Sequence, residues 1–285
     1  MQETAIFRKY RPSSLRISCY SHGTVRLVNK NAFRCAFYEI PAATYDPDKL
    51  PCKALTLHDS DIRVHHGTLS VDFAPELVRM GSFKTSHPGK VQLNNDSELL
   101  PFTNGTVCVK QMYERKGNGD NGAISRLKGN LELDALLVEC NCVRWASILL
   151  DLTYQFIACE VKTRGEAPYP IPKLRFTRVI IALVHDLPTS KAFLVEEWIN
   201  TDDGNHQFIK YLNNRVPHHI SSVPQAPKAW EITDFLIFAQ HVQWKKTQCL
   251  AFTSDFQGAG DLLTDPQIMS NPYVLLVIMS FSLSY

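Results

Sequence analysis

Hydrophobic and polar positions change their spacing several times along the chain, and each change predicts a different element. Residues 68–75 alternate apolar and polar side chains as a half-buried strand does, and residues 106–114 repeat this after a stretch rich in turn residues. Residues 134–157 instead carry apolar side chains at helical spacing. The positions with this spacing are Leu137, Cys140, Trp145, Ile148, Leu149 and Leu152. We therefore expect two strands followed by a long amphipathic helix.

The second half of the chain alternates between strand and helix patterns. After a proline-rich link, residues 174–185 and 191–199 are predicted strands, residues 230–244 a helix and residues 247–256 a strand. This order predicts an α+β fold with an antiparallel sheet first and a mixed sheet in a second lobe. Periodicity before residue 66 is weak and broken by prolines. Residues 1–65 are therefore interpreted as a poorly structured leader.

Composition narrows the class of protein. The 285 residues are 45% hydrophobic and 20% charged, which is typical of a globular protein, and the net charge of +2 is too small to argue for capture of nucleic acid. The eight cysteines form no CxxC pair, and the first residues contain no signal peptide. The apolar residues 273–285 are too few to cross a bilayer, which needs about 20. We expect a cytoplasmic protein with no membrane span and no nucleic-acid partner.

Lys110 lies within a strongly apolar predicted strand. Val107 and Val109 face one side of this strand, and Lys110 faces the other. A lysine in such a place either extends its ammonium to the edge of the strand or binds an anion, and the residues alone leave both readings open. Glu139, on the helix that follows, is a candidate to orient this lysine.

Two adjacent carboxylates, Glu196 and Glu197, end another apolar strand. If the strand continues, one of them faces inward, where a buried carboxylate needs a hydrogen-bond donor. The alternative is a strand end that turns toward solvent, and the spacing alone favours it.

Residues 254–267 form a polar loop with three aspartates and two glycines. The loop has neither the phosphate-binding GxxxxGK[ST] pattern nor the glycine pattern of a dinucleotide site. In an extended backbone, Asp255 and Gln257 point the same way, about 7 Å apart. Carboxylate and amide oxygens are ligands that Mg²⁺ takes together with phosphate oxygens. Gly258 and Gly260 would let the backbone turn sharply beside such an ion.

Two further residues each allow more than one interpretation. Asp265 precedes Pro266, so it either accepts a proton from an incoming hydroxyl or caps a short helix that begins at Pro266. His241 lies in an aromatic helical segment, and no HxxxH or CxC pattern follows it to complete a zinc site. From the residues alone, His241 is interpreted as part of the core.

Taken together, these segments resemble the α-kinases, a family of atypical protein kinases, over about residues 78–272. Residues 255–268, DFQGAGDLLTDPQI, are similar to that family's metal and catalytic loop at nearly every position. Residues 107–113, VCVKQMY, resemble its phosphate-binding lysine strand, and residues 194–199, LVEEWI, resemble its hinge. The His-Arg-Asp and Asp-Phe-Gly signatures of conventional protein kinases are missing.

Two other motifs resemble the family with one departure each. MGSFKTS, residues 80–86, is similar to the loop that covers the nucleotide, with Lys84 where arginine is usual. FIKYLNN, residues 208–214, is similar to a Phe-x-Lys-Tyr-Asn-Asn-Asn segment, with Leu212 in place of the first asparagine.

The resemblance implies a two-lobed, atypical protein-kinase-like domain over residues 66–272, with an antiparallel sheet in the N-terminal lobe and a mixed C-terminal lobe. It implies an ATP-dependent serine/threonine protein kinase that acts on a protein hydroxyl. It assigns ATP contacts to Gly81, Lys84, Lys110, Glu196 and Glu197, Mg²⁺ ligands to Asp255 and Gln257, and catalytic roles to Asp265 and Lys110.

The resemblance also sets expectations for metal binding at the C-terminal end. The family continues into a Gly-Asn loop and a His-x-Cys module that supplies zinc ligands, whereas residues 273–285 here are an apolar segment without either feature. His241 lies fourteen residues before Asp255, which matches the family's first zinc ligand, so a possible but incomplete Zn²⁺ site is expected there. The alternative function is therefore a catalytically inactive pseudokinase that binds nucleotide or a protein.

Overall fold

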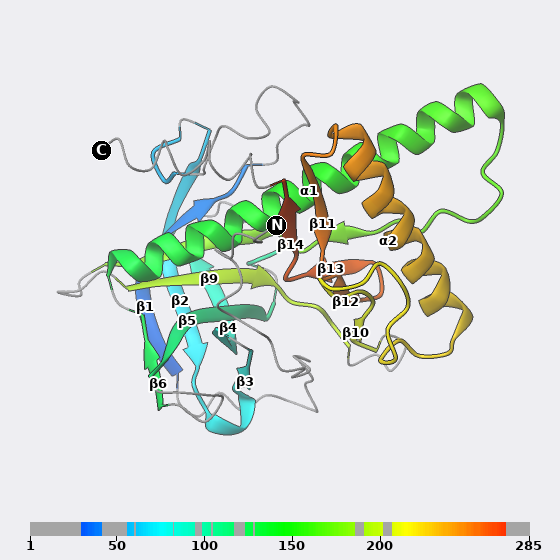
Figure 1. Cartoon of the computed structure of the whole chain (residues 1–285). Helices are drawn as coiled ribbons and strands as arrows, with labels where there is room; N and C mark the ends of the chain where they lie inside the picture. The colour runs from blue at the N-terminus through cyan, green and yellow to red at the C-terminus, as the bar shows by residue number, and fades with distance from the viewer. Residues whose placement is uncertain are drawn as a thin grey trace, which may run out of the picture.

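The protein has two lobes joined by a long helix (Figure 1). The computed structural model describes residues 30–41, 56–59, 61–81, 83–94, 99–103, 105–116, 123–127, 129–185, 191–201 and 207–271. The N-terminal lobe is an antiparallel sheet, and the C-terminal lobe contains a mixed sheet, a strand pair and a helix. The expected α+β, two-lobed fold class is thus confirmed.

Six strands of the N-terminal lobe form a closed ring of antiparallel pairs. Their bounds are β1 Lys30–Glu39, β2 Arg63–Asp72, β4 Lys84–Leu93, β5 Val107–Lys116, β8 Val179–Val184 and β9 Lys191–Glu197. The order is β4-β2-β1-β8-β9-β5, and β5 pairs again with β4. After the short 3-10 helix η1 (Pro75–Leu77), β3 (Arg79–Met80) joins β4, while β6 (Ala123–Arg126) joins β5.

Alternation along β5 and β9 separates two cores. Val107 and Val109 of β5 contribute to the ring's buried cluster, as do Phe193 and Val195 of β9. The intervening Leu194 belongs to a second buried cluster, which includes residues of α1 and of the C-terminal lobe. Because side chains of a strand alternate between faces, Lys110 and Glu196 fall on the side of this second cluster. The sheet therefore directs both charged residues toward the junction between the lobes.

Helix α1 (Asn130–Arg164) links the lobes. Its 35 residues correspond to a length of about 52 Å, and it packs against β9 of the N-terminal lobe and against the C-terminal helix α2 (Pro227–Lys246). Gly165, with a φ of 93°, ends it. The helix is longer at both ends than the predicted residues 134–157. No side-chain cap marks its first turn, which explains why the pattern alone did not locate the start.

The C-terminal lobe contains the polar loop. A four-stranded sheet has the order β10 (Ile209–Lys210), β12 (Gln257–Ala259), β13 (Leu262–Thr264), β7 (Arg175–Phe176), with β13 and β7 parallel and the other pairs antiparallel. A second pair joins β11 (Ala251–Ser254) to β14 (Gln267–Ser270). Residues 255–266 thus lie between β11 and β14 and contain the β12–β13 hairpin, and the pairing of β11 with β14 holds the loop at both ends.

Two predictions of element positions were wrong. Within the expected leader, Lys30–Glu39 forms β1 between β2 and β8, and the consecutive buried residues Cys35, Ala36 and Phe37 interrupt the alternation that would have predicted a strand. The single strand expected at residues 174–185 is two strands, β7 and β8, because the chain crosses from one lobe to the other at Thr177 and Arg178. Residues 1–29, 42–55 and 272–285 lie outside the described residues, so the remaining leader and the apolar segment stay predictions.

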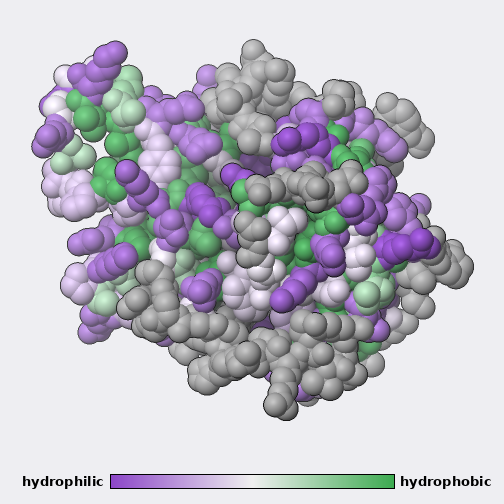
Figure 2. Space-filling model, turned by 180° about the vertical axis from the view of Figure 1, so that it is seen from behind, coloured by the Kyte–Doolittle hydropathy of each residue, from purple (hydrophilic) through white to green (hydrophobic). Residues whose placement is uncertain are grey.

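The helices of the described part were compared with the requirements for crossing a bilayer. None of its helices combines the length and apolar character needed to cross a bilayer. Figure 2 shows the face opposite to that of Figure 1, where hydrophobic side chains lie in small groups between hydrophilic ones.

Candidate active site

Lys110 and Glu196 form a buried ion pair where the lobes meet. Leu194 of β9 pairs with Lys110 of β5, so Glu196 is the diagonal neighbour of Lys110. Both residues are 3% exposed, and Lys110 Nζ lies 2.7 Å from Glu196 Oε2. Lys110 therefore does not extend to solvent, and Glu196 is the inward-facing member of the Glu196–Glu197 pair.

Asp265 accepts hydrogen bonds from two lysines. Its Oδ1 lies 2.7 Å from Lys110 Nζ and 2.9 Å from Lys84 Nζ, and its Oδ2 accepts from the amide of Gln257 at 3.3 Å. Asp265 has a φ of 49°, and strand β14 begins two residues later rather than a helix. The helix-cap interpretation of Asp265 was therefore wrong, and its carboxylate faces the lysines instead.

The charges in this cluster stabilise one another against burial. Burial alone would lower the pKa of Lys110, but Asp265 and then Glu196 raise that pKa well above its usual value. Burial would likewise raise the pKa of Asp265, but Lys110 and Lys84 together hold it far below the usual range. Asp265 is thus a carboxylate, and Lys110 an ammonium, throughout the physiological pH range.

Glu139 of α1 completes the cluster through Lys84. Lys84 Nζ lies 2.5 Å from Glu139 Oε2, and Lys84 is 8% exposed. Burial opposes the charge of Lys84, yet Asp265 and Glu139 raise its pKa above the usual value. Glu139 was expected to orient Lys110, but it binds Lys84. The long helix thereby contacts the lysine that also binds Asp265.

Asp255 and Gln257 lie on the same loop but not on an extended backbone. Asp255 has a φ of 61°, so β11 ends before it and β12 begins at Gln257. Lys210 Nζ lies 2.5 Å from Asp255 Oδ1. Burial raises the pKa of Asp255, and the charge of Lys210 opposes this. The amide of Gln257 contacts Asp265, which brings the predicted metal ligands close to the predicted catalytic carboxylate.

The oxygen donors here fit Mg²⁺ bound together with nucleotide phosphates. No group of three or more His, Cys, Asp or Glu side chains able to hold a metal ion occurs among the described residues. Mg²⁺, however, is usually held by only one or two carboxylates plus phosphate oxygens. Asp255, Gln257 and Asp265 can supply such a partial ligand set.

The predicted hinge and nucleotide-loop residues have structural partners of their own. Glu197 forms a two-point ion pair with Arg175, with both N–O distances 2.6 Å, and its pKa is lowered because Arg175 outweighs the effect of burial. Gly81 donates its N–H to the carbonyl of Lys84 at 2.8 Å and accepts a hydrogen bond from the Tyr113 hydroxyl. Gly81 therefore fixes the turn that leads into β4 and positions Lys84.

Two contacts at the site were not anticipated from the sequence. Thr264 donates its hydroxyl hydrogen to Glu196 Oε2 at 2.9 Å, and Lys210 binds Asp255. No local pattern could have indicated the first contact, because 68 residues separate Thr264 from Glu196. Lys210 lies in the FIKYLNN motif, so its position in that motif was the available signal.

His241 lies apart from this cluster. It is exposed on α2, and the search for metal-binding groups among the described residues found none that includes it. A zinc site at His241 therefore stays a prediction, and its placement in the core was wrong.

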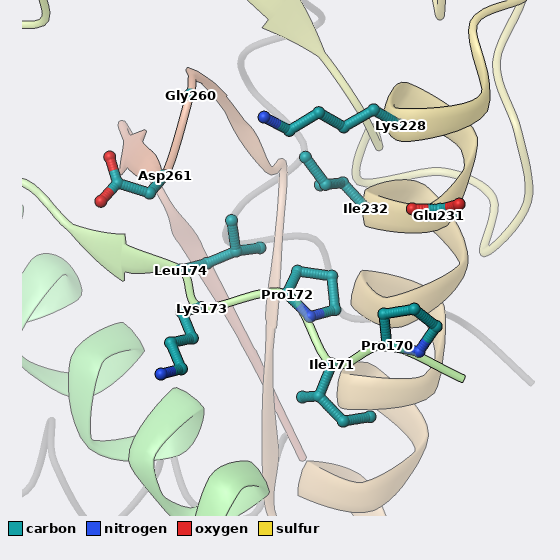
Figure 3. A pocket seen from close by; sticks show the side chains of 10 residues that line it. All are labelled: Pro170, Ile171, Pro172, Lys173, Leu174, Lys228, Glu231, Ile232, Gly260 and Asp261. Atoms are coloured by element: carbon teal, nitrogen blue, oxygen red, sulfur yellow. The ribbon is translucent and has the colours of Figure 1, made fainter. Parts of the chain in front are cut away.

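A separate cavity of about 480 Å³ lies at the far end of the β12–β13 hairpin (Figure 3). Its walls come from the link before β7, from α2 and from the hairpin turn at Gly260 and Asp261. None of the clustered charges lines this cavity. We place the candidate chemistry at the charged cluster, because the groups able to bind phosphate and metal converge there.

Comparison with solved structures finds similar folds at low sequence identity. An α-kinase from Entamoeba histolytica has a TM-score of 0.54 and 14% identity, covering 88% of this chain and 85% of its own. The C-terminally truncated α-kinase domain of myosin heavy chain kinase has a TM-score of 0.50 and 12% identity, covering 88% and 93%. No curated protein sequence matches this chain.

The comparison with protein-family models is more specific than the comparison with solved structures. The model of the alpha-kinase family matches residues 89–274, which is more than half of the chain and includes Lys110, Glu196, Asp255 and Asp265. This chain belongs to the alpha-kinase family.

Proposed function

We propose that this protein is an ATP-dependent serine/threonine protein kinase of the alpha type, which transfers the γ-phosphate of ATP to a hydroxyl of a protein substrate. The observation that carries the proposal is the convergence of Lys84 and Lys110 on Asp265, beside Asp255 and Gln257. Phosphoryl transfer requires mainly positioned cations, metal ligands and a group that orients the hydroxyl, and this cluster contains all three.

Lys84 and Lys110 are the proposed phosphate ligands. Both ammonium groups are almost fully buried, and both contact the single oxygen Oδ1 of Asp265. The phosphates of ATP carry more negative charge than this one carboxylate, so they compete with Asp265 for the lysines. Glu139 and Glu196 keep the ammonium groups within the cluster during this exchange.

Asp255 and Gln257 are the proposed ligands of Mg²⁺, which neutralises charge on the transferred phosphoryl group when it is bound. The positive φ of Asp255 turns its carboxylate out of the line of β11 and toward Lys210. Gly258 lets β12 and β13 approach closely, since a Cβ there would lie 1.9 Å from the Leu262 carbonyl oxygen. Gln257 is thus held on a tightly paired hairpin, and Asp255 lies two residues before it.

Asp265 is the proposed residue that orients the substrate hydroxyl. Its lowered pKa makes it a weak base while Lys84 and Lys110 bind it. Once phosphates attract the lysines, its carboxylate is free to accept a hydrogen bond, and finally the proton, from the attacking hydroxyl. Such a weak base is sufficient, because a loose phosphoryl-transfer transition state needs little proton removal before bond formation.

Phosphate transfer from γ-labelled ATP, measured together with the thermal shift caused by ATP, tests this function. We expect Asp265→Asn to lower transfer at least about 100-fold and to keep the thermal shift, because it preserves shape and removes the charge. Lys110→Ala should lose both readouts. Lys90→Met, at an exposed position of β4, is the matched control and should change neither.

The outcomes separate the two candidate functions. A thermal shift with ATP but no transfer would indicate the nucleotide-binding pseudokinase. That alternative is favoured by one observation, namely that the carboxylate proposed to orient the hydroxyl is bound by two lysines. Absence of both transfer and thermal shift in the folded protein would contradict both the kinase and the nucleotide-binding pseudokinase.

A further inference from the structure

Lys210 places its ammonium on Asp255, one of the two proposed Mg²⁺ ligands. Nζ lies 2.5 Å from Asp255 Oδ1. The side chain of Lys210 is 32% exposed and that of Asp255 17%, whereas those of Lys110 and Glu196 are each 4% exposed. This pair therefore lies at the more open side of the charged cluster.

Backbone bonds fix the position of Lys210 relative to the loop. Lys210 pairs with Gln257 in the register of β10 and β12. The N–H groups of Tyr211 and Leu212 both donate to the carbonyl of Phe256, at 2.9 and 3.2 Å. The residues on the C-terminal side of Asp255 are thus bonded to the segment that carries Lys210. The fold itself brings this ammonium to Asp255.

The three lysines of the site are divided between its two aspartates. Lys84 and Lys110 contact Asp265, and Lys210 contacts Asp255. An oxygen that accepts from an ammonium at this distance cannot also ligate Mg²⁺, at about 2.1 Å, without bringing two cations together. The lysine and a divalent cation therefore compete for this oxygen.

We infer that Lys210 is a built-in competitor for the divalent cation at Asp255. Its ammonium neutralises this carboxylate, and a divalent cation ligates the same oxygen only after the lysine side chain has moved aside. Its partial exposure and flexible stem give the ammonium a route toward water. Lys210 thus weakens binding of the free cation and makes cation binding depend on the extra phosphate oxygens of a nucleotide. This inference rests on the proposed function, because it takes Asp255 as a metal ligand.

A titration with Mn²⁺ alone tests this role without any turnover. The electron paramagnetic resonance signal of free Mn²⁺ measures how much of the ion is bound. We expect Lys210→Met to bind Mn²⁺ about tenfold more tightly than the wild type, because the competing charge is gone. Lys210→Arg keeps the charge and should bind as the wild type does. Lys90→Met removes an exposed positive charge from β4 and should also leave the affinity unchanged.

A purely structural role would give the opposite result. If Lys210 only braced the loop, Lys210→Met would weaken Mn²⁺ binding and lower the melting temperature. Equal or weaker binding by Lys210→Met, or no binding by any variant, overturns the inference. Lys210→Ala repeats the comparison should the methionine variant fail to fold. Asp255→Asn combined with Lys210→Met must abolish the gain, because the cation is placed at Asp255.

The measurements distinguish a failure of this inference from a failure of the proposed function. The comparison of Mn²⁺ affinities uses no ATP and no substrate. Absence of phosphate transfer and of an ATP thermal shift in the wild type counts against the kinase function. An unchanged affinity of Lys210→Met for Mn²⁺ counts against the competition alone.

Discussion

At the scale of single residues, the site concentrates charges that are costly to bury. Lys110 and Glu196 are each 3% exposed, and removing such groups from water costs several kcal/mol before pairing offsets the loss. Buried ion pairs often contribute little net stability, so the cluster fits the proposed binding of phosphate better than a role in folding. Under the proposed function, an incoming phosphate replaces Asp265 as the partner of Lys84 and Lys110.

His87 of β4 is a buried residue whose charge state should control stability at mildly acidic pH. It is 6% exposed, its ring lies against Phe73 with 4.8 Å between centroids, and burial, followed by the charge of Arg126, lowers its pKa to about 4. The unfolded chain binds this proton below about pH 6.5, but the folded protein does so only near pH 4. Stability should therefore fall by up to about 3 kcal/mol as the pH drops through this window.

The measurement for His87 is urea unfolding at several pH values between 7.5 and 4.5. We expect His87→Gln to show a shallower loss of unfolding free energy over this range than the wild type. His66→Gln, at an exposed position of β2, is the control and should keep the wild-type slope. Parallel slopes for wild type and His87→Gln would show that another group governs the acid sensitivity.

At the scale of elements, the sequence predicted both long helices but fewer than half of the strands, and not the strands' partners. The patterns of β5, β9 and α2 were clear because each has an apolar face and a recognisable boundary, whereas β2 begins and ends several residues before the predicted strand. The split between β7 and β8 was missed because hydrophobic spacing does not say which sheet a residue joins. Family resemblance placed Lys110 and Asp265 in one site, but contacts such as Glu139 with Lys84 arise from packing between distant segments.

The β12–β13 hairpin is the element on which the site depends most directly. A Cβ at Gly258 would lie 1.9 Å from the Leu262 carbonyl oxygen, and backbone cannot move aside as a side chain can. Gly260 instead has a φ of 62°, a conformation that asparagine tolerates. We expect Gly258→Ala to lower stability by more than about 2 kcal/mol and Gly260→Asn by less than about 1 kcal/mol.

Thermal unfolding with and without ATP measures both effects on the hairpin. Gly258→Ala should also lose the thermal shift with ATP, because Gln257 and Asp265 lie at the paired end of this hairpin. Gly260→Asn should keep the shift. Equal stability of the two variants would mean that the hairpin relaxes around the new methyl group.

At the scale of the whole molecule, one core joins the two lobes. Leu194 of β9 and Leu236 of α2 are both fully buried, and both belong to the cluster that surrounds α1. A lobe that unfolded alone would expose this shared cluster, so the lobes should unfold together. The site lies at the same junction, which means that the distance between its lysines and its aspartates depends on the packing of this core.

Cooperative unfolding of the lobes is testable because the tryptophans are unevenly placed. Three of the four tryptophans lie in α1 or α2, namely Trp145, Trp230 and Trp244, so their fluorescence reports on the helices, while far-UV circular dichroism also reports on the sheet. We expect Leu194→Ala and Leu236→Ala each to lower the unfolding free energy by about 2–5 kcal/mol, with coincident transitions by both probes. Val64→Ala, at an exposed position of β2, is the control. If Leu236→Ala instead shifted only the fluorescence transition, the lobes would be independent units, and nucleotide binding would have to bring the two halves of the site together.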